Sequence, residues 1–260
     1  MPKRNPVSKT LRALNWLVEC SPPQVGVRQL AEALGIAPSS AHRILLALSE
    51  AGYVRQDART QRYSLGNEFF RVSQLAAAKA PLRQASLAAM LRLVETCKEP
   101  TLLCIYDQIR QEVNYTAALN SNGRAGQTIE LNKWLPIRTG ASGLAILAYL
   151  KEAEVQSIAR RQNFHHRNGD LAEPTQLRSQ LDSVRSKGYA FTRCQWVDGA
   201  SGLAAPIFDG GDKVMGAICV TLPRERAESD KMDRLIDAML HCANDVTKKM
   251  NGSSRSVPLD

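Results

Sequence analysis

Residues 27–48 read VRQLAEALGIAPSSAHRILLAL and predict two short helices joined by a glycine turn. The first helix has apolar residues at spacings that place them on one side: Leu30, Ala31 and Leu34. Gly35 follows where a helix commonly ends in the left-handed conformation. Pro38 suits the first turn of a second helix, because its missing N–H costs no hydrogen bond there. The pattern is typical of a helix-turn-helix, whose second helix enters the major groove of DNA.

The second helix has an apolar side and a polar side. We expect four apolar residues to face the core: Ala41, Ile44, Leu45 and Leu48. Short polar residues followed by an arginine suit insertion into a major groove. We therefore predict that DNA is contacted by Ser39, Ser40, His42 and Arg43. Arg43 is suited either to a guanine edge or to a phosphate, and the sequence does not choose between them.

A basic hairpin follows the two helices. Tyr53-Val54 begins a strand, residues 57–60 are turn-like, and residues 62–65 alternate polar and apolar as a half-buried return strand should. This hairpin is typical of a wing, and we predict backbone or minor-groove phosphate contacts for Arg59 and Arg62. The alternative is a helix pair and hairpin that only pack together, with solvated arginines. A hairpin arriving directly after the helix pair favours DNA binding.

The charge of the chain agrees with a polyanionic partner. The 260 residues give room for about two domains and have a formal net charge of +9. Residues 1–65 hold nine Lys and Arg against four Asp and Glu. The positive charge is therefore densest around the helix-turn-helix, as expected for a domain that binds double-stranded DNA.

Other classes of protein find little support in the sequence. No apolar run reaches the roughly 18 residues that span a bilayer, and the basic N-terminus leads into an amphipathic helix, not a signal core. The cysteines are scattered singly, without a zinc-binding or disulfide pattern: Cys20, Cys97, Cys104, Cys194, Cys219 and Cys242. His165-His166 is more typical of a loop surface than of a metal site, and no phosphate-binding loop or catalytic motif is present. We expect a cytoplasmic protein, and no enzyme, metal, cofactor or membrane association.

The remaining elements divide the chain. We expect a first helix over residues 8–20, capped by Ser8, whose inward residues are Leu11, Leu14, Leu17 and Val18. Helices are also expected over 67–78 and 82–97, the latter with inward residues Leu87, Met90, Leu91 and Val94. Strands are expected over 102–106, 112–117, 189–193, 203–208 and 214–222, with helices over 144–150, 155–162, 175–187 and 229–250. The predicted division is a DNA-binding domain (1–66), a linker helix (67–80), an effector-binding and oligomerisation domain (81–251) and a disordered tail (252–260).

The chain resembles the IclR family of bacterial transcriptional regulators. Besides the helix-turn-helix, the resemblance depends on the order and separation of residues 8–14, 62–66, 135–143, 188–191 and 202–209. It implies an α+β fold: a winged helix-turn-helix, a linker helix and an α/β effector-binding domain related to GAF and PAS folds. It also implies homodimers or dimers of dimers on two-fold or repeated operators, often near catabolic genes, and a small organic acid as effector.

The resemblance places an effector pocket between residues 135–143 and the sheet. The backbone of Ala141 and Ser142 would face a carboxylate, and Leu135 would form an apolar wall. The ligand-contacting positions on the sheet fall on Thr192, Gly202, Cys219 and Thr221.

The sequence departs from the family pattern near this pocket. Residues 192–196 lack the acidic residues of many members, Leu144 stands where lysine is frequent, and position 202 is glycine. These departures suggest a roomier, less acidic pocket. Trp134, Trp196 and Arg193 would then favour an aromatic carboxylate, unless the tryptophans are structural and the arginine is solvated.

We interpret the chain as a ligand-responsive, sequence-specific DNA-binding regulator of transcription. Three alternatives remain open on the sequence alone. The first is a redox-responsive regulator using Cys194 and Cys219. The second is a small-molecule enzyme with a winged-helix appendage, and the third is an architectural DNA-binding protein without an effector.

Overall fold

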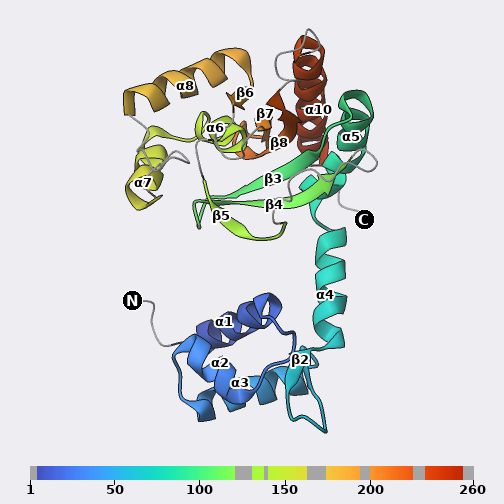
Figure 1. The fold of residues 1–260 in the computed structure, drawn as a ribbon, viewed down its shortest axis with the longest axis vertical. Coiled ribbons are helices and arrows are strands. Elements are labelled where there is room, and N and C mark those ends of the chain that lie inside the picture. The colour runs from blue at the N-terminus through green and yellow to red at the C-terminus, as the bar shows by residue number, and fades with distance from the viewer. Residues whose placement is uncertain are drawn as a thin grey trace, which may run out of the picture. The chain divides into compact units, whose positions relative to one another are not determined.

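The computed structural model describes residues 5–120, 131–137, 140–162, 174–193, 200–224 and 232–253. The chain packs as two compact units, Met1–Ala80 and Pro81–Asp260 (Figure 1). The expected mixture of a helical N-terminal part and an α/β C-terminal part is confirmed. Among the described helices, none combines the length and apolar character needed to cross a membrane.

The N-terminal unit contains the predicted helix-turn-helix and hairpin. Its elements are α1 (Pro6–Glu19), α2 (Val27–Leu34), α3 (Pro38–Glu50), β1 (Val54–Gln56), β2 (Tyr63–Leu65) and α4 (Asn67–Ala78). Leu30 and Leu45 are fully buried where α2 and α3 meet, and Tyr63 adds the hairpin to the same core. The glycine turn is confirmed, since Gly35 has φ 63° and ψ 43° and its N–H bonds to the end of α2.

The first helix differs from its prediction at both its start and its faces. Asn5, not Ser8, caps α1, because its side-chain oxygen accepts from the Val7 N–H at 3.0 Å. Leu11 and Val18 do not face the core: their exposed fractions are 57% and 50%. Leu17 is buried as predicted, and Leu14 is half-buried against the same core. Ala13, one turn before Leu17, completes the inward side.

The C-terminal unit is built on a six-stranded antiparallel sheet of order β5-β4-β3-β8-β7-β6. The strands are β3 (Thr101–Asp107), β4 (Glu112–Leu119), β5 (Trp134–Pro136), β6 (Ala190–Arg193), β7 (Ala200–Phe208) and β8 (Val214–Pro223). Helices α5 (Pro81–Cys97) and α10 (Met232–Ser253) pack on one face of the sheet. Helices α6 (Ala141–Leu147), α7 (Glu152–Gln162) and α8 (Pro174–Lys187) lie on the other (Figure 1).

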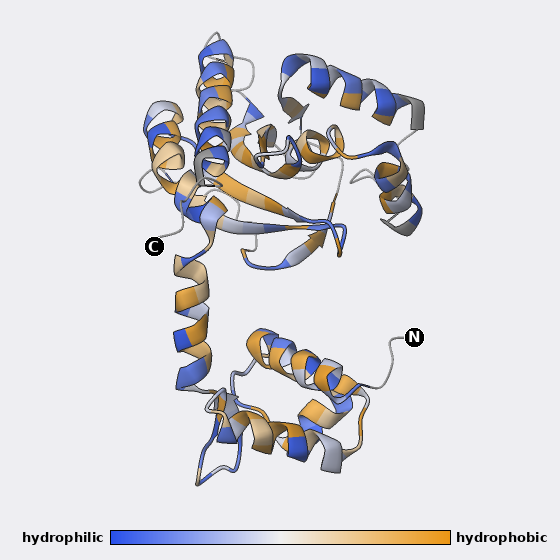
Figure 2. Ribbon diagram, turned by 180° about the vertical axis from the view of Figure 1, so that it is seen from behind, coloured by the Kyte–Doolittle hydropathy of each residue, from blue (hydrophilic) through white to orange (hydrophobic). Residues whose placement is uncertain are grey.

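Two separate cores result from the alternation of side chains along the central strands. Cys104 and Cys219 face the side of α6, whereas Leu103, Ile218 and Val220 face α5 and α10. Figure 2 shows hydrophilic and hydrophobic residues mixed along α8 and α10, as expected for helices with one buried and one exposed side.

Helix α5 has the predicted position but a different buried side. Met90 and Val94 are buried as expected, whereas Leu87 and Leu91 are 48% and 47% exposed. The buried stripe uses small residues instead: Ala85, Ser86 and Ala89. Small side chains let α5 approach the sheet and α10 closely, so the leucines on the opposite side remain in solvent.

The remaining element ends shift by a few residues from their predicted places. The short edge strand β5, which pairs with β4, was not predicted. Helix α10 continues to Ser253, past the predicted end at Met250, and residues 254–260 lie outside the described part of the chain. The predicted boundaries of the linker helix and of the tail remain predictions.

Candidate DNA-binding surface and effector pocket

The second helix of the helix-turn-helix presents its polar side to solvent. Ser39, His42 and Arg43 are exposed, and Ser40 is half-buried. On the opposite side Ala41, Leu45 and Leu48 are buried, and Ile44 is half-buried against the same core. The buried side chains therefore hold α3 against the core of the N-terminal unit, and the four predicted DNA-contacting residues lie on or near the outer side of the helix. Which of them touch DNA remains a prediction.

A single carboxylate shapes the tip of the hairpin. Asp57 Oδ1 accepts hydrogen bonds from the Arg59 N–H at 3.0 Å, the Thr60 N–H at 2.7 Å and the Thr60 hydroxyl at 2.9 Å. These bonds, above all the one from the Thr60 N–H, lower the pKa of Asp57. The turn holds Arg59 exposed at the tip, in a position suited to a phosphate.

Arg62 is placed differently from Arg59. Its guanidinium donates to the Gln24 carbonyl at 2.9 and 3.2 Å and to Gln29 Oε1 at 2.9 Å. Gln29 Oε1 also accepts from the N–H of Gly26, which caps α2. Arg62 therefore ties the return strand of the wing to the segment that begins α2, in addition to any contact with DNA.

The C-terminal unit contains a pocket of about 120 Å³ between α6 and the sheet. It brings together six of the seven predicted effector-binding residues: Ala141, Ser142, Thr192, Gly202, Cys219 and Thr221. Leu135 is not among the described lining residues. It lies in the edge strand β5 opposite Val113 and packs against the core beside the pocket.

Strand register explains why residues far apart in sequence meet here. Thr192, Gly202 and Thr221 are direct cross-strand partners on β6, β7 and β8, so their positions share one face of the sheet. Because Gly202 has no side chain, the space between this face of the sheet and α6 stays open. A Cβ at this position would lie 3.1 Å from Ala141 Cβ and 3.2 Å from Thr192 Oγ1, so a larger residue would enter the pocket.

Tyr115 is a lining residue that sequence reasoning missed. Its hydroxyl lies 2.6 Å from Ser142 Oγ, within hydrogen-bond distance. Burial raises the pKa of the Tyr115 phenol well above its usual value, and the nearby thiols of Cys104 and Cys219 add to the effect. The sequence signal was the alternation of β4, which places Tyr115 on the same face as the buried Val113.

The residues proposed to favour an aromatic carboxylate lie elsewhere. Arg193 follows Thr192 in β6, so its side chain points to the opposite face, where its guanidinium lies 5.6 Å from the Phe191 ring. Trp134 lies 5.2 Å from the Arg110 guanidinium on the edge strand and does not line the pocket. Trp196 lies outside the described residues. None of the described lining residues has a charged side chain.

One of the two thiols of the redox alternative, Cys219, is buried. Cys219 is 6% exposed, and burial raises its pKa to about 12, against a smaller lowering by the Ser142 hydroxyl. Redox-active cysteines are typically accessible thiolates with a lowered pKa. Cys194 and the His165-His166 pair lie outside the described residues. In the described part of the chain, no cluster of three or more His, Cys, Asp or Glu residues is placed to hold a metal ion.

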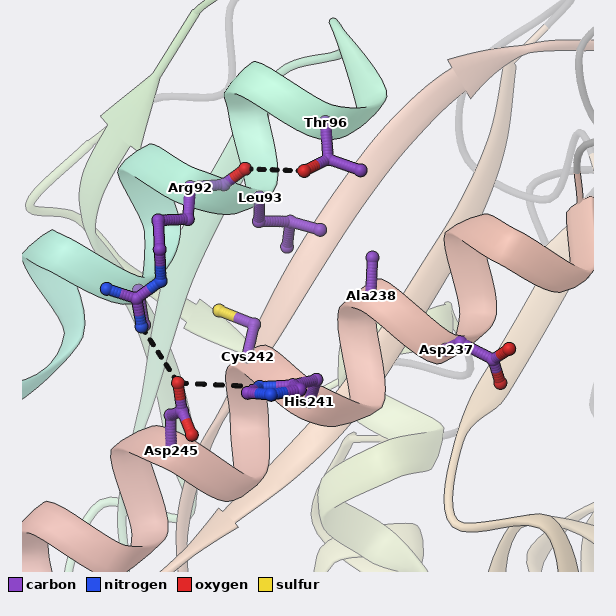
Figure 3. Close-up of a pocket in the computed structure, with 9 residues that line it drawn as sticks. Arg92, Leu93, Thr96, Asp237, Ala238, His241, Cys242 and Asp245 are labelled. Atoms are coloured by element: carbon purple, nitrogen blue, oxygen red, sulfur yellow. Dashed lines mark hydrogen bonds and ion pairs between the residues drawn. The ribbon is translucent and has the colours of Figure 1, made fainter.

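A second, larger hollow of about 340 Å³ lies on the other side of the sheet, between α5 and α10 (Figure 3). The Arg92 guanidinium of α5 reaches across to Asp245 of α10 at 2.8 Å, and His241 Nδ1 lies 3.4 Å from the same carboxylate. The partly exposed Arg92–Asp245 ion pair joins the two helices but contributes little stability. His241 and Asp245 both lie on α10, so their contact stays within one helix.

Family models match both units of the chain. The model of the IclR helix-turn-helix domain matches residues 6–58. The model described as "Bacterial transcriptional regulator IclR C-terminal" matches residues 74–248. The chain belongs to the IclR family. It is thus similar along most of its length to regulators of transcription that bind DNA.

Two curated relatives of this IclR-family chain are similar along about nine-tenths of their length. The transcriptional repressor IclR of Escherichia coli K12 is 25% identical over 247 residues, which are 95% of this chain and 90% of that protein. The glycerol operon regulatory protein of Streptomyces coelicolor is 28% identical over 230 residues, 87% and 89% of the two chains.

Solved structures show the same fold. An IclR regulator from Alicyclobacillus acidocaldarius superposes with a TM-score of 0.80 at 22% identity, covering 94% of this chain and 98% of that one. An IclR homologue from Microbacterium hydrocarbonoxydans, complexed with 4-hydroxybenzoate, gives a TM-score of 0.80 at 18% identity over 95% and 100% of the two chains.

Proposed function

We propose that this IclR-family regulator binds a specific operator through α3 and the wing and responds to a small organic acid. Base contacts come from the outer side of α3: Ser39, Ser40, His42 and Arg43. Arg59 at the wing tip contacts the phosphate backbone. The exposure of these side chains above a well-packed core supports this assignment.

The effector binds in the pocket between α6 and the sheet. The observation that supports this most strongly is that six residues chosen from the sequence, from four separate elements, line one cavity. The complex of an IclR homologue with 4-hydroxybenzoate supports an organic acid as the chemical class. The cavity of about 120 Å³ has room for a small organic acid.

The response follows from linkage. The protein acts as a homodimer or a dimer of dimers, in which two α3 helices read the two halves of an operator. An effector that binds one quaternary arrangement more tightly shifts the population toward it and so changes operator affinity. The regulated genes would be catabolic genes that act on the effector or on a compound derived from it.

A footprint of the purified protein on the DNA flanking its own gene tests this proposal. We expect a protected two-fold or repeated site that survives unlabelled competitor DNA, and a change in protection when a short organic acid is added. Protection lost to competitor would support an architectural DNA-binding protein instead. Turnover of an added acid would support the enzyme hypothesis.

A further inference from the structure

The inner wall of the pocket contains a pair of facing hydroxyl groups. Tyr115 OH and Ser142 Oγ lie 2.6 Å apart, one on β4 and the other on α6. Each hydroxyl supplies one proton and accepts others. Since a single hydrogen bond between them uses one proton, the pair retains a second proton that it can donate.

The protein groups at either end of this pair are thiols. The Tyr115 hydroxyl is within hydrogen-bond reach of the Cys104 thiol, and the Ser142 hydroxyl is within reach of the Cys219 thiol. Sulfur is a weak hydrogen-bond acceptor, and Cys219 directs its own S–H to the Ala217 carbonyl at 3.8 Å. An oxygen atom of a bound molecule would therefore be a better acceptor for the spare proton than either thiol.

We propose that Tyr115 and Ser142 select the effector by donating this hydrogen bond to an oxygen acceptor, a carboxylate or carbonyl oxygen, at its inner end. The inference depends on the proposed effector pocket and names the groups that determine its specificity. A ligand with only a cationic amine at this end binds more weakly, because the ammonium offers no acceptor for the spare proton and no described lining residue is anionic. An alkyl end also binds more weakly, because it leaves a buried donor unpaired.

The donor is present across the physiological pH range. Because burial raises the pKa of the Tyr115 phenol well above its usual value, the hydroxyl keeps its proton. Selection by this pair is therefore independent of pH between about 6 and 9, apart from the titration of the ligand itself.

A matched series of three-carbon probes tests the proposal on the full chain: propionate, propionamide and propylamine, with affinities measured by ligand-observed NMR. We expect wild type to bind the acid and the amide at least tenfold more tightly than the amine. Tyr115→Phe removes only the hydroxyl, and we expect it to weaken binding of the two acceptor probes about tenfold, the usual effect of one lost hydrogen bond. Ser142→Ala should do the same, which keeps the test valid if one variant folds poorly.

Tyr106→Phe is the matched control. The Tyr106 hydroxyl donates to Glu154 Oε1 at 2.7 Å and lies outside the pocket, so its removal should change probe affinity less than twofold. Gly202→Val fills the pocket and should abolish binding of all three probes.

The outcomes separate this inference from the proposed pocket. If Gly202→Val abolishes binding but Tyr115→Phe and Ser142→Ala bind like wild type, the pocket stands and the selecting pair is refuted. Equal binding by wild type and Gly202→Val refutes both, as does failure of wild type to bind any probe. A wild type that prefers propylamine refutes the acceptor chemistry directly.

Discussion

Replacing Arg62 with glutamine separates two roles that an arginine on a wing can have. The guanidinium donates three hydrogen bonds, two to the Gln24 carbonyl and one to Gln29 Oε1. If Arg62 mainly positions the wing, its loss should loosen the segment before α2. If it mainly binds phosphate, its loss should weaken DNA binding through charge alone.

The expected loss of stability follows from these contacts. Arg62 is only half-buried, so each bond contributes about 0.5 kcal/mol, at the low end of the usual range, and the three together about 1–2 kcal/mol. Since 1.4 kcal/mol is a factor of ten, amide hydrogen exchange over residues 24–30 should accelerate about 5- to 30-fold in Arg62→Gln. The Val25 N–H, bonded to the Tyr63 carbonyl at 2.9 Å, is the most direct reporter.

DNA binding measured against salt gives the second half of the test. Fluorescence anisotropy with a short duplex should show the same slope of log affinity against log salt for Arg62→Gln as for wild type. Arg59→Gln, the matched change at the wing tip, should flatten the slope by about 0.9 without changing exchange over residues 24–30. A flattened slope with unchanged exchange in Arg62→Gln would refute the positioning role.

Three further predictions follow from the same structure. Arg43→Ala should weaken binding to the protected operator by about 1–3 kcal/mol and leave binding to unrelated duplexes nearly unchanged, as gel-shift titrations of both DNAs would show. Leu45→Ala removes a fully buried side chain between α2 and α3 and should lower the free energy of unfolding of the N-terminal unit by about 2–5 kcal/mol in urea titrations, whereas the same change at the exposed Leu46 should cost under about 1 kcal/mol. Because its pKa is raised to about 12, the Cys219 thiol stays protonated at pH 8. A thiol reagent should therefore label Cys219 at pH 8 far more slowly in the native protein than in the unfolded chain. Rapid labelling of the native protein that is abolished by Cys219→Ser would restore the redox hypothesis.

Local patterns were enough to predict the helix-turn-helix and the hairpin, but not the cap and the exposed residues of α1. Gly35, Pro38 and the apolar spacing of α2 and α3 specify helix ends and buried sides through neighbouring residues alone. In α5 the prediction failed because the partner surface is distant in sequence. Leu87 and Leu91 are more apolar than Ala85 and Ala89, but the close approach of α10 selects the small residues for the buried side.

The pocket illustrates the same limit. Thr192, Gly202 and Thr221 were chosen by resemblance, and their meeting depends on strand pairings that no local pattern encodes. Tyr115 was missed because its place in the pocket depends on β4 lying two strands away from β8, in an order that does not follow the chain. Arg193 was misplaced for a simpler reason, since the alternation of a strand already puts it opposite Thr192.

Strand β8 is a wall shared by two compartments. Cys219 and Thr221 face the pocket, while Ile218, Val220 and Leu222 anchor the opposite core. The side chains of the two sets alternate along the strand, so those that meet a ligand can vary with little effect on those that hold the domain together. A regulator built on such a strand can diverge toward new metabolites by changing every second residue, while its fold is inherited through the others.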